Sequence, residues 1–165
     1  HEIESIESVH QYEIIFCDVK GIGKKFNSRH EGAHIISEIK KIYPYKTIIV
    51  YSAYTFNPEY NHYFNMADDV MKKDEDSDNW IDFLDSKIES ILNPSLRWLK
   101  IRDYLVKNNV NLFEIVQLEA AYVKSFLKKD SDIFIKNNIL KKFTPDVRGV
   151  IQSFAGSILF KILIG

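Results

Sequence analysis

The sequence has little cysteine, little net charge and no long uninterrupted apolar run, and each of these features argues against one class of protein. Its 165 residues contain a single cysteine, Cys17, which excludes an internal disulfide framework. The 22 basic residues nearly balance the 23 acidic ones, so a net charge of −1 gives no general case for binding nucleic acid or an anionic membrane. No signal peptide, internal repeat or low-complexity linker is visible. The length suits one domain, or one domain with an appendage.

The stretch 150–164 is apolar but is interrupted by polar side chains at Gln152, Ser153, Ser157 and Lys161. It is shorter than the ~20 residues that a membrane-spanning helix needs. We therefore predict no membrane span here. We expect a helix that is buried or that docks a partner, and an interfacial membrane helix is the alternative.

No nucleic-acid partner is predicted either. No helix with a basic face suited to DNA recognition stands out after residue 93. The lysines that occur in pairs are scattered along the chain, which indicates solvated faces rather than one basic patch. These pairs lie at 24–25, 40–41, 128–129 and 141–142.

The first half of the chain alternates between strand and helix patterns, beginning with the apolar run that contains Cys17. This run ends at an acid, Asp18, and continues into a loop with Gly21 and Gly23. Such a run is typical of a strand buried on both faces, so we interpret Cys17 as a core thiol and not a reactive one. The alternation predicts a parallel sheet with helices on both faces. Strands are predicted at 12–17, 47–51 and 67–71, with helices at 31–43 and from the acidic 74–78 loop to 92.

From Asn93 onward no strand pattern appears, and helix signals follow one another. Asn93 and Pro94 are typical of a helix cap and a first helical residue, and Asn111 begins a pattern that resembles a capping box. We therefore divide the chain into an α/β domain over 1–92 and an all-helical C-terminal extension over 93–165. Four helices are predicted in the extension, at 94–107, about 111–128, 131–142 and from 144 onward.

An acid, a hydroxyl and an amine come at the carboxyl ends of the three predicted strands, as Asp18, Ser52 and Lys73. These ends lie side by side in a parallel sheet, where open α/β sheets form their sites. Phosphoryl transfer to a carboxylate uses this set of groups, with the aspartate as nucleophile and the hydroxyl and ammonium binding phosphoryl oxygens. A divalent cation normally shares the negative charge through carboxylate and backbone oxygens.

The region 1–92 resembles the receiver domain of response regulators in two-component signalling. The strand that ends at Asp18 is similar to the phosphoacceptor strand of that family, and Glu31-Gly32-Ala33 is similar to the glycine-led start of its third helix. The stretch 43–53 resembles its fourth strand, which ends in Ser/Thr-Ala. The stretch 67–73 resembles its Ala-Asp-Asp-Tyr-Leu-x-Lys sequence. The resemblance implies a flavodoxin-like, doubly wound parallel sheet, followed here by the helical extension.

The resemblance also implies a phosphorelay protein in which Asp18 accepts a phosphoryl group that Ser52 and Lys73 bind. It implies a Mg²⁺ ion held by Asp18 and the backbone carbonyl of Lys20, provided that the acidic pair of the family's first strand exists. The chain begins at His1 rather than Met, so we expect that strand to be missing from this sequence.

The implied partner is a sensor histidine kinase or a phosphotransfer protein, and the implied location is the cytoplasm. The extension over 93–165 would carry the output, with a homodimer through its helices as one form of it. Any catalysis would be limited to self-phosphorylation and autodephosphorylation, rather than the reaction of a metabolic enzyme.

Some features depart from the family pattern. The acidic first strand is absent, and the loop after Asp18 lacks the usual Met-Pro and is longer. Val70 stands where the family has its switch aromatic, and Asp74 replaces the proline after the lysine. These departures leave open an alternative, a pseudo-receiver that is not phosphorylated and acts as a protein-interaction module.

A further alternative comes from His30-Glu31-Gly32-Ala33-His34, which matches the H-E-x-x-H pattern of zinc peptidases. On a helix this pattern puts two imidazoles on one face for zinc, with the glutamate as general base. The central glycine disfavours a rigid helix by about 1 kcal/mol, and a third ligand would have to be His62 or Glu59. We therefore expect His30 and His34 to be exposed loop and helix-face residues.

Overall fold

The computed structural model describes residues 5–19, 31–53 and 58–165 of the chain. Contacts divide the chain into two compact units, which are described separately below. The predicted boundary after residue 92 lies close to this division, but no sequence pattern indicates that 43–45 belongs with the helical part. The first unit consists of residues 1–42 and 46–89, and the second of residues 43–45 and 90–165.

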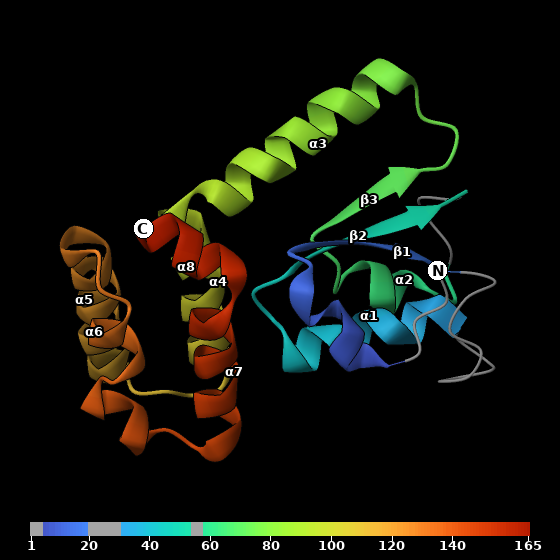
Figure 1. Cartoon of the computed structure of the whole chain (residues 1–165). Coiled ribbons are helices and arrows are strands. Elements are labelled where there is room, and N and C mark those ends of the chain that lie inside the picture. Colours follow the sequence, from blue (N-terminus) through green and yellow to red (C-terminus); the bar gives the residue numbers. More distant parts are fainter. Residues whose placement is uncertain (1–4, 20–30, 54–57) are drawn as a thin grey trace. The chain divides into compact units, whose positions relative to one another are not determined.

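A parallel sheet forms the centre of the first unit (Figure 1). Its central strand buries Ile48, Ile49 and Val50 completely, as expected of the middle strand of a parallel sheet. The strands lie side by side in the order β1-β2-β3. Their bounds are β1 (Ile14–Asp18), β2 (Thr47–Ser52) and β3 (Asp69–Lys72).

One face of this sheet carries the side chains of Phe16, Asp18 and Tyr51. Asp18 lies opposite Tyr51 in the parallel register, and alternate residues of a strand share a face. Trp80, in the first turn of α3 (Ser77–Leu92), lies against the two aromatic rings of this face. Its ring centroid is 5.4 Å from that of Phe16 and 5.6 Å from that of Tyr51. The acid at the end of β1 therefore lies on an aromatic face.

The opposite face carries Cys17 and is covered by α1 (Glu31–Ile42). The Cys17 thiol donates a hydrogen bond to the carbonyl of Gly32, with an Sγ–O distance of 3.1 Å. The short helix α2 (Asn61–Phe64) lies on the same side of the sheet and contacts α1 (Figure 1). The apolar side chains of α1 are buried because they repeat at helical spacing, at Ala33, Ile36 and Ile39.

The predicted flavodoxin-like, doubly wound sheet is wrong. In the described residues the sheet has only three strands, their order in space is their order in the chain, and helices account for 66% of the structure. A doubly wound sheet needs a point where the strand order reverses, and this sheet has none in the described part. The residues after Lys72 supply helix caps and helical spacing instead of further strands, so the helical part outweighs the sheet.

Lys46 is a fully buried cation in the first unit, with no exposed surface. Its Nζ donates hydrogen bonds to the carbonyls of His10 and Tyr12, at 2.8 and 2.5 Å. These carbonyls lie where the 3₁₀ helix η1 (Ile6–Gln11) ends and the chain turns into β1. The ammonium therefore ties the N-terminal segment to the start of β2.

Lys40 also differs from the prediction of a solvated face, because only 15% of its side chain is exposed. Its Nζ lies 2.5 Å from Oδ2 of Asp68, and the same carboxylate oxygen accepts a hydrogen bond from the backbone N–H of Ile48 at 2.8 Å. Asp68 thereby joins α1, β2 and the start of β3. The third strand begins at Asp69, two residues after the predicted start at 67.

The second unit is helical, and most of its helices begin at a residue whose side chain caps them. Asn93 accepts hydrogen bonds from the backbone N–H groups of Ser95 and Leu96, and Asn111 accepts one from Phe113, as the sequence predicts. The predicted helix over 131–142 is broken into α6 and η2. The bounds are α4 (Pro94–Lys107), α5 (Leu112–Lys128), α6 (Asp132–Ile135), η2 (Asn138–Lys142), α7 (Pro145–Gly156) and α8 (Ile158–Ile164).

An aromatic cluster forms the core of the second unit. Tyr122 lies within it, and the burial raises the pKa of its phenol, whose hydroxyl donates to the carbonyl of Pro94 at 2.9 Å. Ring centroids of neighbouring members lie 4.9–6.4 Å apart, within the range of favourable aromatic pairing. The members are Trp98, Tyr122, Phe126, Phe134, Phe154 and Phe160.

The apolar C-terminal stretch is not one helix but two, because the chain bends by 58° between α7 and α8. Ser157 has an extended backbone at the break, and its hydroxyl caps α8 by accepting from the N–H of Phe160 at 3.2 Å. Phe154, Phe160 and Ile164 are buried, as expected of a helix that packs into a core. Within the described residues no single helix is long and apolar enough to span a membrane. Only α7 and α8 taken together reach that length and apolar content, and the two are bent relative to each other.

Cys17 is buried as predicted, and its burial raises the pKa of the thiol to about 12. At pH 9 about one folded molecule in a thousand then carries the thiolate, whereas an unfolded thiol with the ordinary value of 9.0 is half ionised. We expect iodoacetamide to leave the folded chain unlabelled at pH 9 and to label it in urea, as read by intact mass. The variant Ile162→Cys, at a position 67% exposed, is the labelled control. Comparable labelling of Cys17 and Cys at 162 in the folded chain would contradict this prediction.

Candidate functional site

Asp18 and Lys73 form an ion pair at the edge of the sheet where the strands end. Nζ of Lys73 lies 2.5 Å from Oδ2 of Asp18. Asp18 is the last residue of β1 and Lys73 follows β3, so the pair passes in front of the end of β2. The side chains are 29% and 38% exposed, which leaves the carboxylate within reach of a solute. The structure therefore brings together two of the three residues that the sequence predicts at this edge.

Ser52, the third predicted residue, is placed differently. It follows Tyr51, the register partner of Asp18, so strand alternation directs its side chain to the opposite face of the sheet. Ser52 is buried, with 4% of its surface exposed. Its backbone carbonyl accepts a hydrogen bond from the N–H of Lys73 at 3.1 Å. Ser52 contributes to the site by fixing the backbone of Lys73.

Tyr51 and Trp80 complete the surroundings of the ion pair, and neither was a predicted site residue. Nζ of Lys73 lies 5.3 Å from the centroid of the Tyr51 ring, a cation–π distance. Trp80 supports the same ring from α3. The alternation of side chains along β2 could have indicated Tyr51, because it places Tyr51 rather than Ser52 on the same face as Asp18.

The described residues offer no complete metal site. They contain no group of three or more His, Cys, Asp or Glu side chains placed to hold an ion, and this includes His62 and Glu59. Lys20, whose carbonyl the family resemblance implies as a Mg²⁺ ligand, lies outside the described residues. Of the implied ligands, the structure therefore places Asp18 alone.

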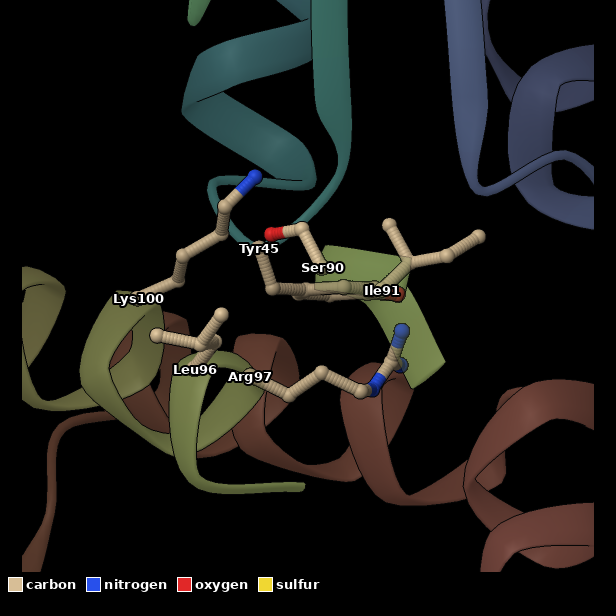
Figure 2. A pocket seen from close by; sticks show the side chains of 6 residues that line it. All are labelled: Tyr45, Ser90, Ile91, Leu96, Arg97 and Lys100. Atoms are coloured by element: carbon tan, nitrogen blue, oxygen red, sulfur yellow. The ribbon is translucent and has the colours of Figure 1, made fainter. Parts of the chain in front are cut away.

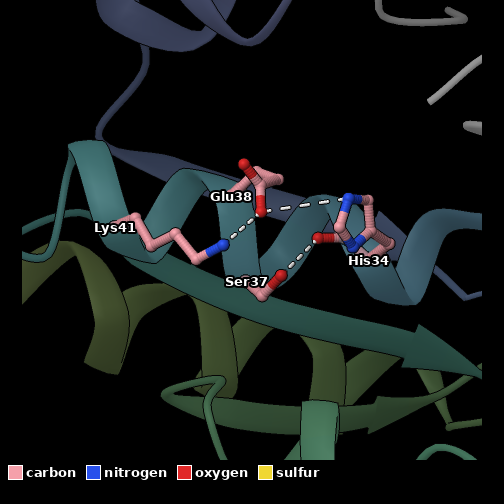
Figure 3. Close-up of polar contacts among 4 residues, drawn as sticks. All are labelled: His34, Ser37, Glu38 and Lys41. Carbon is pink, nitrogen blue, oxygen red and sulfur yellow. Dashed lines mark hydrogen bonds and ion pairs between the residues drawn. The ribbon is translucent and has the colours of Figure 1, made fainter. Parts of the chain in front are cut away.

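The H-E-x-x-H motif can be followed only in part, since His30 and the Glu31 side chain lie outside the described residues. His34 is a partly exposed residue of the α1 face, with Nε2 3.9 Å from Oε1 of Glu38 (Figure 3). Glu38 accepts a hydrogen bond from Lys41 at 2.5 Å, which holds the pKa of its carboxyl below the ordinary value. His34 therefore faces a carboxylate that already accepts a hydrogen bond from Lys41.

A small pocket in the second unit is lined by residues of both charged and apolar type (Figure 2). The space open to the centre of a water molecule is about 10 Å³, which suits roughly one water. The guanidinium of Arg97 and the ammonium of Lys100 point to opposite ends of it (Figure 2). The pocket is therefore too small, and its cations too divergent, for a phosphate or a larger anion.

The edge of the sheet thus presents a solvent-accessible carboxylate with an ammonium on one of its oxygens, beside an aromatic wall. A carboxylate so placed can act as a nucleophile, and an ammonium beside it can neutralise negative charge on a group that it attacks. Comparison of the chain with protein-family models, with curated proteins and with solved structures returned no match.

Proposed function

We propose that this chain is a phosphoryl-acceptor signalling protein, in which Asp18 takes a phosphoryl group and the helical second unit carries the output. The observation that supports the proposal is the ion pair between Asp18 and Lys73 at an accessible sheet edge. The donor would be a phosphohistidine of a partner kinase or phosphotransfer protein, or a small acyl phosphate.

The transfer is a single displacement at phosphorus. A carboxylate oxygen of Asp18 attacks the phosphorus atom, the bond from phosphorus to the leaving group breaks, and an acyl phosphate forms. With acetyl phosphate the leaving group is acetate. Lys73, whose ammonium now contacts the carboxylate, then neutralises the phosphoryl oxygens as their charge develops. The Tyr51 ring and the carbonyl of Ser52 hold Lys73 in place for this role.

Magnesium is the ion that such chemistry commonly uses. Among the described residues, no group of three or more His, Cys, Asp or Glu side chains is placed to hold it. No step above depends on the ion. The test is therefore run both with and without added Mg²⁺.

Incubation with acetyl phosphate is expected to add one phosphoryl group per chain, as read by intact mass, and hydroxylamine is expected to remove it. Asp18→Asn should abolish the addition. Lys73→Gln should slow it on the order of a hundredfold, the usual effect of removing one charge-stabilising donor. Because the pair is partly exposed, neither variant should lose more than about 1 kcal/mol of stability.

Lys72→Gln is the matched control. Lys72 is exposed, precedes Lys73, and lies in register with Ser52, so its side chain points away from the Asp18 face. The Lys72→Gln variant should be phosphorylated at the wild-type rate. The proposal fails if the wild-type chain neither incorporates a phosphoryl group nor binds beryllofluoride. That outcome would favour the alternative of an unphosphorylated interaction module, in which the Asp18–Lys73 pair is a structural clasp.

A further inference from the structure

Helix α5 has two apolar faces, and only one of them is used by the second unit. Ile115, Leu118 and Tyr122 point into the aromatic core and are buried. A second set of side chains lies on the other side of the helix and is exposed. This set, called the outer stripe, consists of Phe113, Val116, Ala120, Val123 and Leu127.

The outer stripe is strongly exposed for apolar side chains. Phe113 is 66% exposed, Val116 54%, Val123 50% and Leu127 78%. Their spacing alternates between three and four residues, which is the spacing of the a and d positions of a coiled coil. Stripes of this kind pack against a second helix that carries the same spacing.

The charges beside the stripe indicate what that second helix is. With Phe113 at an a position, Glu119 occupies g and Lys124 occupies e. In a parallel pair of identical helices, g of one helix lies beside the e position five residues later on the other. Glu119 of each copy would therefore meet Lys124 of its partner, and the pairing occurs twice. In an antiparallel pair g faces g, and Glu119 would meet its own copy or an apolar residue.

The size of the stripe sets the strength of the contact. A helix of 17 residues is about 25 Å long, and two such helices packed side by side bury on the order of 900 Å² in total. That area lies at the low end for specific interfaces and corresponds to weak, reversible association. A second copy of the chain matches this length and area, because its α5 carries the same outer stripe.

We propose that the chain forms a parallel, two-fold dimer through the outer stripe of α5. The interface lies in the second unit and uses none of the residues at the sheet edge of Asp18. Phe113, Val116, Ala120, Val123 and Leu127 form its centre. Glu119 and Lys124 flank it and set the orientation.

Sedimentation equilibrium of the full chain is expected to show a mass that rises with concentration from 19.3 kDa towards twice that value. The double variant Val116→Glu/Val123→Glu should raise the dissociation constant at least tenfold. Ile158→Glu/Ile162→Glu is the matched control, since these α8 side chains are 62% and 67% exposed and lie off the stripe. Circular dichroism should be unchanged in both, because every substituted side chain is exposed.

A charge exchange tests the orientation. Glu119→Lys alone, or Lys124→Glu alone, should weaken the dimer several-fold, and the double exchange should restore it. Leu127→Cys should form an intermolecular disulfide under a mild oxidant, since a positions meet in a parallel pair, whereas the wild-type chain with its buried Cys17 should not. A wild-type chain that stays at 19.3 kDa up to millimolar concentration, a higher oligomer, or single exchanges without effect would overturn the proposal.

Discussion

Phe154→Ala is expected to lower the free energy of unfolding of the second unit by about 3–5 kcal/mol, the usual range for a buried phenylalanine. Phe154 is fully buried in α7. Its ring lies 5.3 Å from those of Tyr45 and Phe160, and the guanidinium of Arg97 lies 5.2 Å from its centroid. The substitution empties the middle of the aromatic cluster, which the surrounding rings fill only in part.

Urea denaturation followed by near-ultraviolet circular dichroism measures this loss, because the signal comes from packed aromatic rings. Phe154→Leu, which keeps most of the volume, should lose clearly less. Ile158→Ala, two residues beyond the end of α7 and 62% exposed, should stay within about 0.5 kcal/mol of wild type. A loss below about 1 kcal/mol for Phe154→Ala would mean that the cluster is not closely packed.

Lys46→Met is expected to destabilise the first unit by about 2–4 kcal/mol. Methionine fills most of the space of the lysine stem but removes the donor that the carbonyls of His10 and Tyr12 share. A hydrogen bond from a charged group contributes about 1.5–3 kcal/mol. Removing a buried ammonium also removes its own desolvation cost, so the sum falls below that of two such bonds.

Hydrogen exchange distinguishes this effect from a general loss of stability. The backbone N–H of Thr47 donates to the carbonyl of Glu13 at 2.9 Å, and its protection should fall first when the N-terminal segment loosens. Lys41→Met is the control, because Lys41 is 65% exposed and pairs with Glu38 on the helix surface. Equal stability of Lys46→Met and wild type would show that the buried ammonium does not hold the segment.

The local elements of the chain were predictable where one physical signal dominates. The strands before Asp18 and Ser52 are apolar runs, and they were predicted to within two residues at either end. The caps at Asn93 and Asn111 fix the starts of α4 and α5 because a side-chain oxygen meets an orphan backbone N–H. These signals act over three or four residues and do not depend on the rest of the fold.

The incorrect predictions concern features that depend on residues distant in the sequence. Three strands were predicted from the sequence pattern and three are found in the described residues, but the doubly wound sheet that the family resemblance implied is not what forms. Lys46 has no sequence signal of burial, since its partners are backbone carbonyls more than thirty residues earlier. At the site, the contact between Asp18 and Lys73 followed from strand order, but the place of Ser52 depended on register, which a one-residue change reverses.

The stacking of Trp80 on Phe16 and Tyr51 has an optical consequence. The chain has two tryptophans, and they lie in different units. Trp98 is 3% exposed and stacks on Tyr122 with centroids 5.2 Å apart, whereas Trp80 is only partly covered and lies against the ring that carries Lys73. Intrinsic fluorescence therefore contains one emitter beside the sheet edge and one shielded reference. A soluble quencher separates the two signals, so events at Asp18 can be followed without attaching a dye.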